Sequence, residues 1–315
     1  MHAVTRPVYE EEAVPAGTAA EAVIRVPPPK VAAAPSPARP SRPSAAVART
    51  AAWLATAIPR LLWAMVSLGL FIGAWHLATE YRLDFYIRFV NVPGPTEVLG
   101  NFSDMLNTSR YYEHVWFSMQ RILIGFGIAT VLGVLLGLLI GQYRPVRNLL
   151  FPIFEVLRPI PAIAWVPMAV MLWPTNETSI VFITFLGSFF PILLNTIHGV
   201  GSVDPVLVRA GRCLGAGEAA LLRQVILPAA LPHIFTGLAI GMGVAWVSLI
   251  AAEMISGQFG VGYFTWEAYS LIEYADIVVG MITIGVLGLA CSGAIRLVGN
   301  LMMPWLPTSA GGGKS

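Results

Sequence analysis

The chain of 315 residues is 56% hydrophobic and only 11% charged, with a mean hydropathy of +0.71 and a formal net charge of +2. Soluble domains carry about a quarter charged residues, so this composition excludes an ordinary soluble domain and predicts an integral membrane protein. The basic residues are dispersed rather than clustered, which gives no support for a nucleic-acid partner. Cys213 lies in a basic loop and Cys291 in an apolar segment, a pattern that does not predict a disulfide framework.

The N-terminal residues 1–52 are rich in Ala and Pro, and we expect them to form a disordered tail without the apolar core of a signal peptide. The first apolar stretch, near Leu61–Ala78, is uncharged and approaches the roughly twenty residues that cross a bilayer. An amphipathic run follows at Val98–Leu106, behind Pro95, and predicts an interfacial helix. Residues 53–116 are therefore expected to hold the first transmembrane helix and an external interfacial segment.

Further apolar segments make up a transmembrane core that we expect at residues 117–303. They are Ile122–Ile140, Leu149–Trp173, Ile180–Ile197, Ile234–Ala252 and Ile277–Ile295. Gly133 and Gly137 are spaced by four, which permits close helix approach. The predicted fold class is an all-α membrane protein with about six transmembrane helices, ending in a flexible tail at 304–315.

A polar, basic stretch, Asp204–Pro232, interrupts the hydrophobic segments, and we name it the elbow. Asp204 and Pro205 predict a capped helix start, and Gly215 supplies the positive φ that ends a helix. A second short helix is expected from Glu218 until Pro228. Because each helix is too short to be stable alone, the elbow is typical of a docking surface; the alternative is an ordinary solvated loop.

Lys and Arg are unevenly distributed among the predicted loops. The N-terminal tail, Gln142–Asn148, the elbow and the C-terminus are basic, whereas Pro174–Thr178 and Glu253–Asp276 contain neither Lys nor Arg. By the positive-inside rule, the elbow and both termini are expected in the cytoplasm.

No residue constellation predicts an enzyme. The histidines do not fall at metal-ligand spacing with other ligand types, so no metal site is expected. The C-terminal Gly311–Ser315 lacks the first glycine of a phosphate-binding loop and is interpreted as a flexible tail. The chain is therefore expected to carry no nucleotide site of its own.

Polar groups inside the predicted spans are the remaining candidates, because such groups are costly in a membrane. Arg158 stands within the third span, beside Pro159 and Pro161, which remove backbone donors and break the helix. A cation beside a broken helix is a candidate lining for an anion pathway; the alternative is a structural pair with Glu155, one turn earlier. Glu253 closes the fifth span, either as a gating or docking group or as a solvated helix end.

The elbow resembles the signature loop of bacterial ABC-importer permeases, which reads Glu-Ala-Ala, three residues, Gly, nine residues, Ile, one residue, Leu-Pro. Gly215 and Leu227-Pro228 match this pattern. The Glu-Ala-Ala position is filled by Arg209-Ala210-Gly211, a departure that puts in doubt the contact made by the usual acid. The literal Glu218-Ala219-Ala220 is out of register with the motif.

The resemblance covers most of the chain from about Ala51. Within the family, the sequence is similar to the branch of nitrate, sulfonate, taurine and bicarbonate permeases. The runs that carry it are Pro93–Val98, Ser118–Phe126, Leu157–Pro167, Phe189–Thr196, Leu227–Leu238, Gly243–Met254 and Phe259–Ser270. The last two runs are closer to nitrate and bicarbonate permeases than to taurine permeases.

The resemblance implies the type I importer permease fold in a bacterial inner membrane. It also implies a second permease copy in a homodimer, cytoplasmic ATPase subunits that use ATP and Mg, an external solute-binding protein and a small anion as substrate, with no cofactor in this chain. The elbow would seat in an ATPase groove, with Leu221 among its apolar anchors. The implied coupling residues are Arg209, Ala210, Gly211, Arg212, Leu214, Gly215, Leu222, Leu227 and Pro228. The alternative is a self-sufficient ion-coupled transporter or channel that uses the Arg158 region.

Overall fold

The computed structural model describes residues 45–81 and 92–305, and every regular element within these ranges is a helix, as predicted. The chain divides into two compact units, residues 1–63 and 64–315, at a boundary inside helix α1 (Ala45–Glu80). Helix α1 begins at Ala45, so the tail expected to extend to residue 52 ends earlier. The remainder of that tail and residues 306–315 lie outside the described residues.

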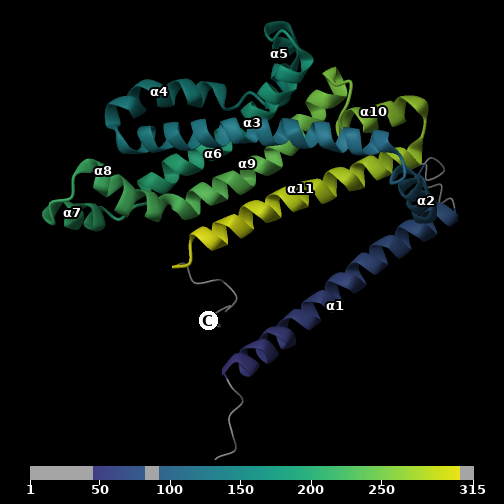
Figure 1. Ribbon diagram of the computed structural model, residues 1–315, viewed down its shortest axis with the longest axis horizontal. Helices are drawn as coiled ribbons and strands as arrows, with labels where there is room; N and C mark the ends of the chain where they lie inside the picture. The colour runs from purple at the N-terminus through teal and green to yellow at the C-terminus, as the bar shows by residue number, and fades with distance from the viewer. Residues whose placement is uncertain (1–44, 82–91, 306–315) are drawn as a thin grey trace, which may run out of the picture. The chain divides into compact units, whose positions relative to one another are not determined.

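Three long helices form the centre of the second unit. Helix α3 (Ser109–Gln142) and helix α9 (Leu227–Ser256) both pack on helix α6 (Asn176–Gly201), and helix α11 (Tyr274–Met302) packs on α9 (Figure 1). In lipid, such helices associate through close van der Waals packing rather than through the hydrophobic effect. Small residues at the interfaces are therefore the main sequence signal of this arrangement.

The predicted close approach at Gly133 and Gly137 is confirmed. A Cβ added at Gly137 would lie 2.6 Å from Thr196 Cβ, and one added at Gly133 would lie 2.9 Å from Ile192 Cγ2. Both partners belong to α6. The α3 and α6 backbones are thus in direct apposition along this stretch.

Gly137→Ala is expected to lower the stability of the protein in detergent by about 1–3 kcal/mol, the usual cost of overpacking a tight contact. The matched control is Gly127→Ala on the same helix, where no atom lies within 4 Å of the added Cβ. The measurement is the thermal unfolding midpoint of both variants. Equal midpoints for Gly137→Ala and the control would show that the α3–α6 contact is looser than described.

The third predicted span is broken, as its sequence indicates. Helix α4 (Arg144–Leu157) is followed by η2 (Ala162–Trp165) and α5 (Val166–Leu172), and the two halves are bent by 86°. Pro159 and Pro161 lie in the bend, where they cannot donate backbone hydrogen bonds. Within the described residues, five continuous helices are long and apolar enough to cross a membrane, and the bent pair brings the total to six.

The first half of the elbow folds as predicted. Helix α7 (Pro205–Cys213) begins behind Asp204, whose carboxylate accepts a hydrogen bond from Val206 N at 2.8 Å. It ends at Cys213 and is followed by Gly215, whose φ is +82°, and Ala216 N donates to Gly211 O at 3.0 Å. This six-to-one bond beside a left-handed glycine is a Schellman cap. Helix α8 (Glu218–Leu221) then starts where expected.

The predicted end of the second elbow helix at Pro228 is wrong. Helix α8 continues through a π-helical turn, η3 (Leu222–Ile226), directly into α9, and together they form one apolar segment, Glu218–Ser256. In the π turn, Leu227 N donates to Leu222 O, five residues back. The wider turn accommodates Pro228, which cannot make the usual bond four residues back. The fifth span therefore begins in the elbow rather than at Ile234.

Two shorter helices flank the end of the bundle opposite the elbow. Helix α2 (Pro95–Met105) confirms the helix predicted at Val98–Leu106. It packs on α11, with Asn101 Nδ2 donating to Asp276 Oδ1 at 2.8 Å. Helix α10 (Val261–Leu271) lies inside the acidic segment Glu253–Asp276 that was predicted as a loop. Its apolar and aromatic residues show no clear amphipathic period, so the sequence pattern did not indicate it.

Candidate translocation and coupling sites

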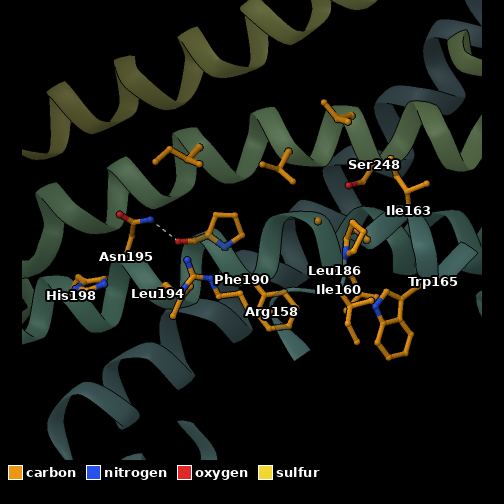
Figure 2. Close-up of a pocket in the computed structure, with 17 residues that line it drawn as sticks. Arg158, Ile160, Ile163, Trp165, Leu186, Phe190, Leu194, Asn195, His198 and Ser248 are labelled. Carbon is orange, nitrogen blue, oxygen red and sulfur yellow. Dashed lines mark hydrogen bonds between the residues drawn. The ribbon is translucent and has the colours of Figure 1, made fainter. Parts of the chain in front are cut away.

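A cavity of about 540 Å³ lies where the broken span meets α6 and α9. Most of its lining is apolar, including Ile160, Leu186 and Phe190. Its polar side chains are few, and Figure 2 shows Arg158, Asn195 and His198 toward one end of the cavity and Ser248 toward the other. An apolar cavity with a small number of polar groups is the usual form of a small-molecule site.

Arg158, the candidate pathway residue, lines this cavity. It follows the last residue of α4, and its side chain is exposed. The alternative of a structural pair with Glu155 is not supported, because no ion pair joins these two residues, both of which the structure describes. Pro161 also lines the cavity, whereas Pro159 contributes only to the bend.

Glu253 does not line the cavity, and the interpretation as a solvated helix end is wrong. Its side chain is 0% exposed. Its carboxylate accepts hydrogen bonds from Ser118 Oγ at 2.8 and 2.9 Å and from Gly262 N at 2.9 Å. The carboxylate thus lies at the N-terminus of α10, where free backbone N–H groups favour negative charge.

The charged partner of Glu253 is Arg121 on α3, which sequence reasoning did not select. Arg121 is 2% exposed and donates from Nη1 to Glu253 Oε1 at 2.8 Å and to Phe259 O at 2.6 Å. Its other edge donates to Glu177, from Nε at 2.7 Å and from Nη2 at 2.5 Å. An arginine inside an apolar helix was the available signal, since intramembrane charges mark partners or function by default.

The elbow presents both basic and apolar groups on its surface. Arg209, Arg223 and Leu214 are exposed, the last at 89%. Arg212 is also exposed and forms an ion pair with Glu218 at 3.1 Å, which gives the out-of-register acid a local partner. Leu221, predicted as an apolar anchor, is 1% exposed and cannot contact another subunit without unfolding α8.

Gly211 explains part of the departure from the Glu-Ala-Ala pattern. A Cβ at this position would lie 2.6 Å from Leu221 Cδ2, so the glycine lets α7 and α8 approach closely. Ala210 is exposed on the other side of α7. The remaining predicted coupling residues Leu222, Leu227 and Pro228 are half-buried at the junction with α9.

A bundle of membrane-length helices, a broken span beside a cavity and a capped elbow between two spans define a multi-pass membrane transport component. A family profile described as "Binding-protein-dependent transport system inner membrane component" matches residues 129–307. The chain belongs to this family, the permease components of ABC importers, and is a transport subunit rather than an enzyme.

Curated relatives agree with this assignment. The nitrate import permease protein NrtB of Synechocystis is 31% identical over 255 residues, covering 78% of this chain and 90% of that protein. A putative ABC transporter permease of Methanocaldococcus jannaschii is 40% identical over 205 residues, covering 65% of this chain and 77% of that protein. The bicarbonate transport system permease protein CmpB of Synechococcus elongatus is 40% identical over 173 residues, covering 55% of this chain and 62% of that protein.

A solved structure supports the fold. The crystal structure of an amino acid ABC transporter with histidines aligns with a TM-score of 0.50 at 20% sequence identity, covering 65% of this chain and 98% of that chain. The predicted importer permease fold is therefore confirmed, as is the prediction of a multi-pass membrane protein.

Proposed function

We propose that this permease subunit carries a small oxyanion, either nitrate or bicarbonate, into the cell at the expense of ATP hydrolysed by a partner subunit. The observation that carries the proposal is Arg158 in the cavity, where no carboxylate of the described residues pairs with it. A guanidinium attracts an anion and offers planar, forked donors to its oxygens. The nitrate and bicarbonate relatives support the same substrate class.

The complete pathway in this proposal needs a second copy of the chain. Several apolar residues that line the cavity are also exposed, among them Ile163, Ile240 and Val247. In a membrane, exposed apolar residues contact either lipid or another protein, and we infer a protein contact here because these residues also line the cavity. A homodimer would place the equivalent wall of the second copy opposite and enclose the anion between two Arg158 side chains.

The elbow would couple this pathway to the ATPase. Because α8, the π turn and α9 are continuous, a displacement of α8 is transmitted directly to α9, which forms one wall of the cavity. Rigid-body motion of packed helices is a common way to switch a site between two openings. ATP and Mg would be bound by the partner alone, with the elbow and both termini in the cytoplasm and a solute-binding protein on the opposite face.

A reconstitution experiment tests this function. Proteoliposomes with the permease, its ATPase and its binding protein are expected to accumulate labelled nitrate or labelled bicarbonate only when ATP is present. The same lipid with the permease alone is expected to accumulate neither. Uphill uptake by the permease alone would instead favour the self-sufficient transporter, and uptake of neither anion by the full complex would exclude the proposed substrate class.

A further inference from the structure

The cluster around Arg121 lies at the end of the helix bundle opposite the elbow. Glu177 is the second residue of α6, which runs from there to the elbow, and Glu253 lies three residues before the end of α9, which runs away from the elbow. Figure 1 shows α10, whose first turn contacts this cluster, at the opposite end of the bundle from α7 and α8. The elbow and the Arg121 cluster therefore lie at opposite ends of the same two helices, α6 and α9.

Arg121 connects three helices through one guanidinium. It belongs to α3, its Nε and Nη2 bind Glu177 of α6, and its Nη1 binds Glu253 of α9. Planar forked donors hold two carboxylates in fixed directions, which a lysine ammonium does not. The two carboxylates differ in environment, since Glu253 is fully buried and the side chain of Glu177 is 55% exposed.

The cluster also fixes the start of α10 against α3. Val261 N donates to Ser118 Oγ at 2.9 Å, and Gly260 N donates to His114 Nδ1 at 3.1 Å. Ser118 in turn donates to Glu253. The acceptors on α3 and α9 thus satisfy backbone donors that a helix N-terminus otherwise leaves unpaired.

The cavity lies between the two ends. Ser248 lines it and precedes Glu253 on α9 by five residues, while Gly187 of α6 packs directly on Ser248. Beyond this contact, toward the start of α6, the buried Ile180 and Ile183 belong to the same apolar cluster as Leu249 of α9. The Arg121 guanidinium adds a polar link between α6 and α9 there. A movement that begins at the elbow reaches the far end of the cavity only if α6 and α9 stay together there.

We propose that Arg121, Glu177 and Glu253 form a tie that makes α3, α6 and α9 move as one body, so that displacement of the elbow opens or closes the far end of the cavity. These are positioning residues: they act through the helices and do not touch the anion. The inference rests on the proposed function, because it assigns the tie a role in coupling ATP hydrolysis to import. A role in folding alone would be served equally well by apolar residues of similar volume.

The test compares two ways of cutting the tie in the complete importer complex. The double variant Arg121→Met with Glu253→Gln removes the link, because methionine has no N–H donor, and it leaves no buried charge unpaired. Glu177→Ala cuts only the α6 arm, because alanine offers no acceptor to Arg121, and it does so at a half-exposed position. The control is Arg110→Gln, which breaks an exposed ion pair with Glu267 at the same end of the bundle.

The measurement is the amount of labelled nitrate or bicarbonate imported per ATP hydrolysed in proteoliposomes. Both tie variants are expected to hydrolyse ATP but to lower this ratio about fivefold or more, while the control keeps it. If the double variant does not assemble, Glu177→Ala alone gives the test, and a wild-type ratio of import to ATP hydrolysis in Glu177→Ala overturns the tie. If the wild-type complex itself hydrolyses ATP without importing either anion, the proposed function fails rather than the tie.

Discussion

Gly215→Val is expected to abolish transport while the protein remains in the membrane at normal levels. Gly215 has a φ of +82° at the end of α7, and a β-branched residue is strongly disfavoured in the left-handed region. The substitution costs about 1–2 kcal/mol locally, enough to displace the Schellman cap that sets the angle between α7 and α8. Gly215 lies between the candidate spans Asn176–Gly201 and Glu218–Ser256, so we expect membrane insertion to be retained.

The matched control is Gly217→Val, only two residues further along. Gly217 has a φ of −72° and a ψ of 166°, extended values that valine adopts readily, and no atom lies within 4 Å of an added Cβ. Labelled-anion uptake and membrane abundance are measured for both variants. Undiminished uptake with Gly215→Val would refute the coupling role of the elbow, as would equal loss in the control.

Arg158→Ala is expected to reduce uptake about tenfold or more while the ATPase subunits still co-purify with the permease. A hydrogen bond to a charged group is worth roughly 1.5–3 kcal/mol, and the alanine variant loses it at the anion site. Arg144→Ala is the matched control, because Arg144 is an exposed arginine at the other end of α4 and does not line the cavity.

The double variant Glu155→Ala with Arg158→Ala separates the two interpretations of Arg158. If Arg158 recognises the anion, removing Glu155 as well leaves uptake as low as in the single variant. Restored uptake in the double variant would mean that the two residues form a structural pair after all. Uptake assays on both variants, normalised to the amount of assembled complex, give the answer.

Local signals in the sequence predicted the parts of the fold that depend on neighbouring residues. Asp204 followed by Pro205 specifies a helix start, and Gly215 specifies a helix end, because caps depend on only a few adjacent positions. The break at Arg158-Pro159-Ile160-Pro161 was predicted for the same reason: proline acts on its own turn of helix. Arg158 was selected from this break as a candidate lining for an anion pathway.

The features that were missed depend on distant residues or on small energetic differences. Arg121 and Glu253 are 132 residues apart in the chain, so only the packing of α3 on α9 shows that the buried acid has a partner. The π turn before Pro228 was missed because a proline usually ends a helix, whereas here a wider turn absorbs it. Helix α10 has no hydrophobic period and was therefore predicted as a loop.

The central claim is that the elbow is seated in a partner ATPase, and Cys213 provides a direct test because it lies exposed at the end of α7, beside Leu214. In a Cys291→Ser background it is the remaining cysteine, and its rate of modification by a membrane-impermeant maleimide is measured in inside-out vesicles. We expect rapid labelling of the permease alone and a large decrease in rate when the ATPase subunits are bound. An equal rate with and without the ATPase would contradict the account.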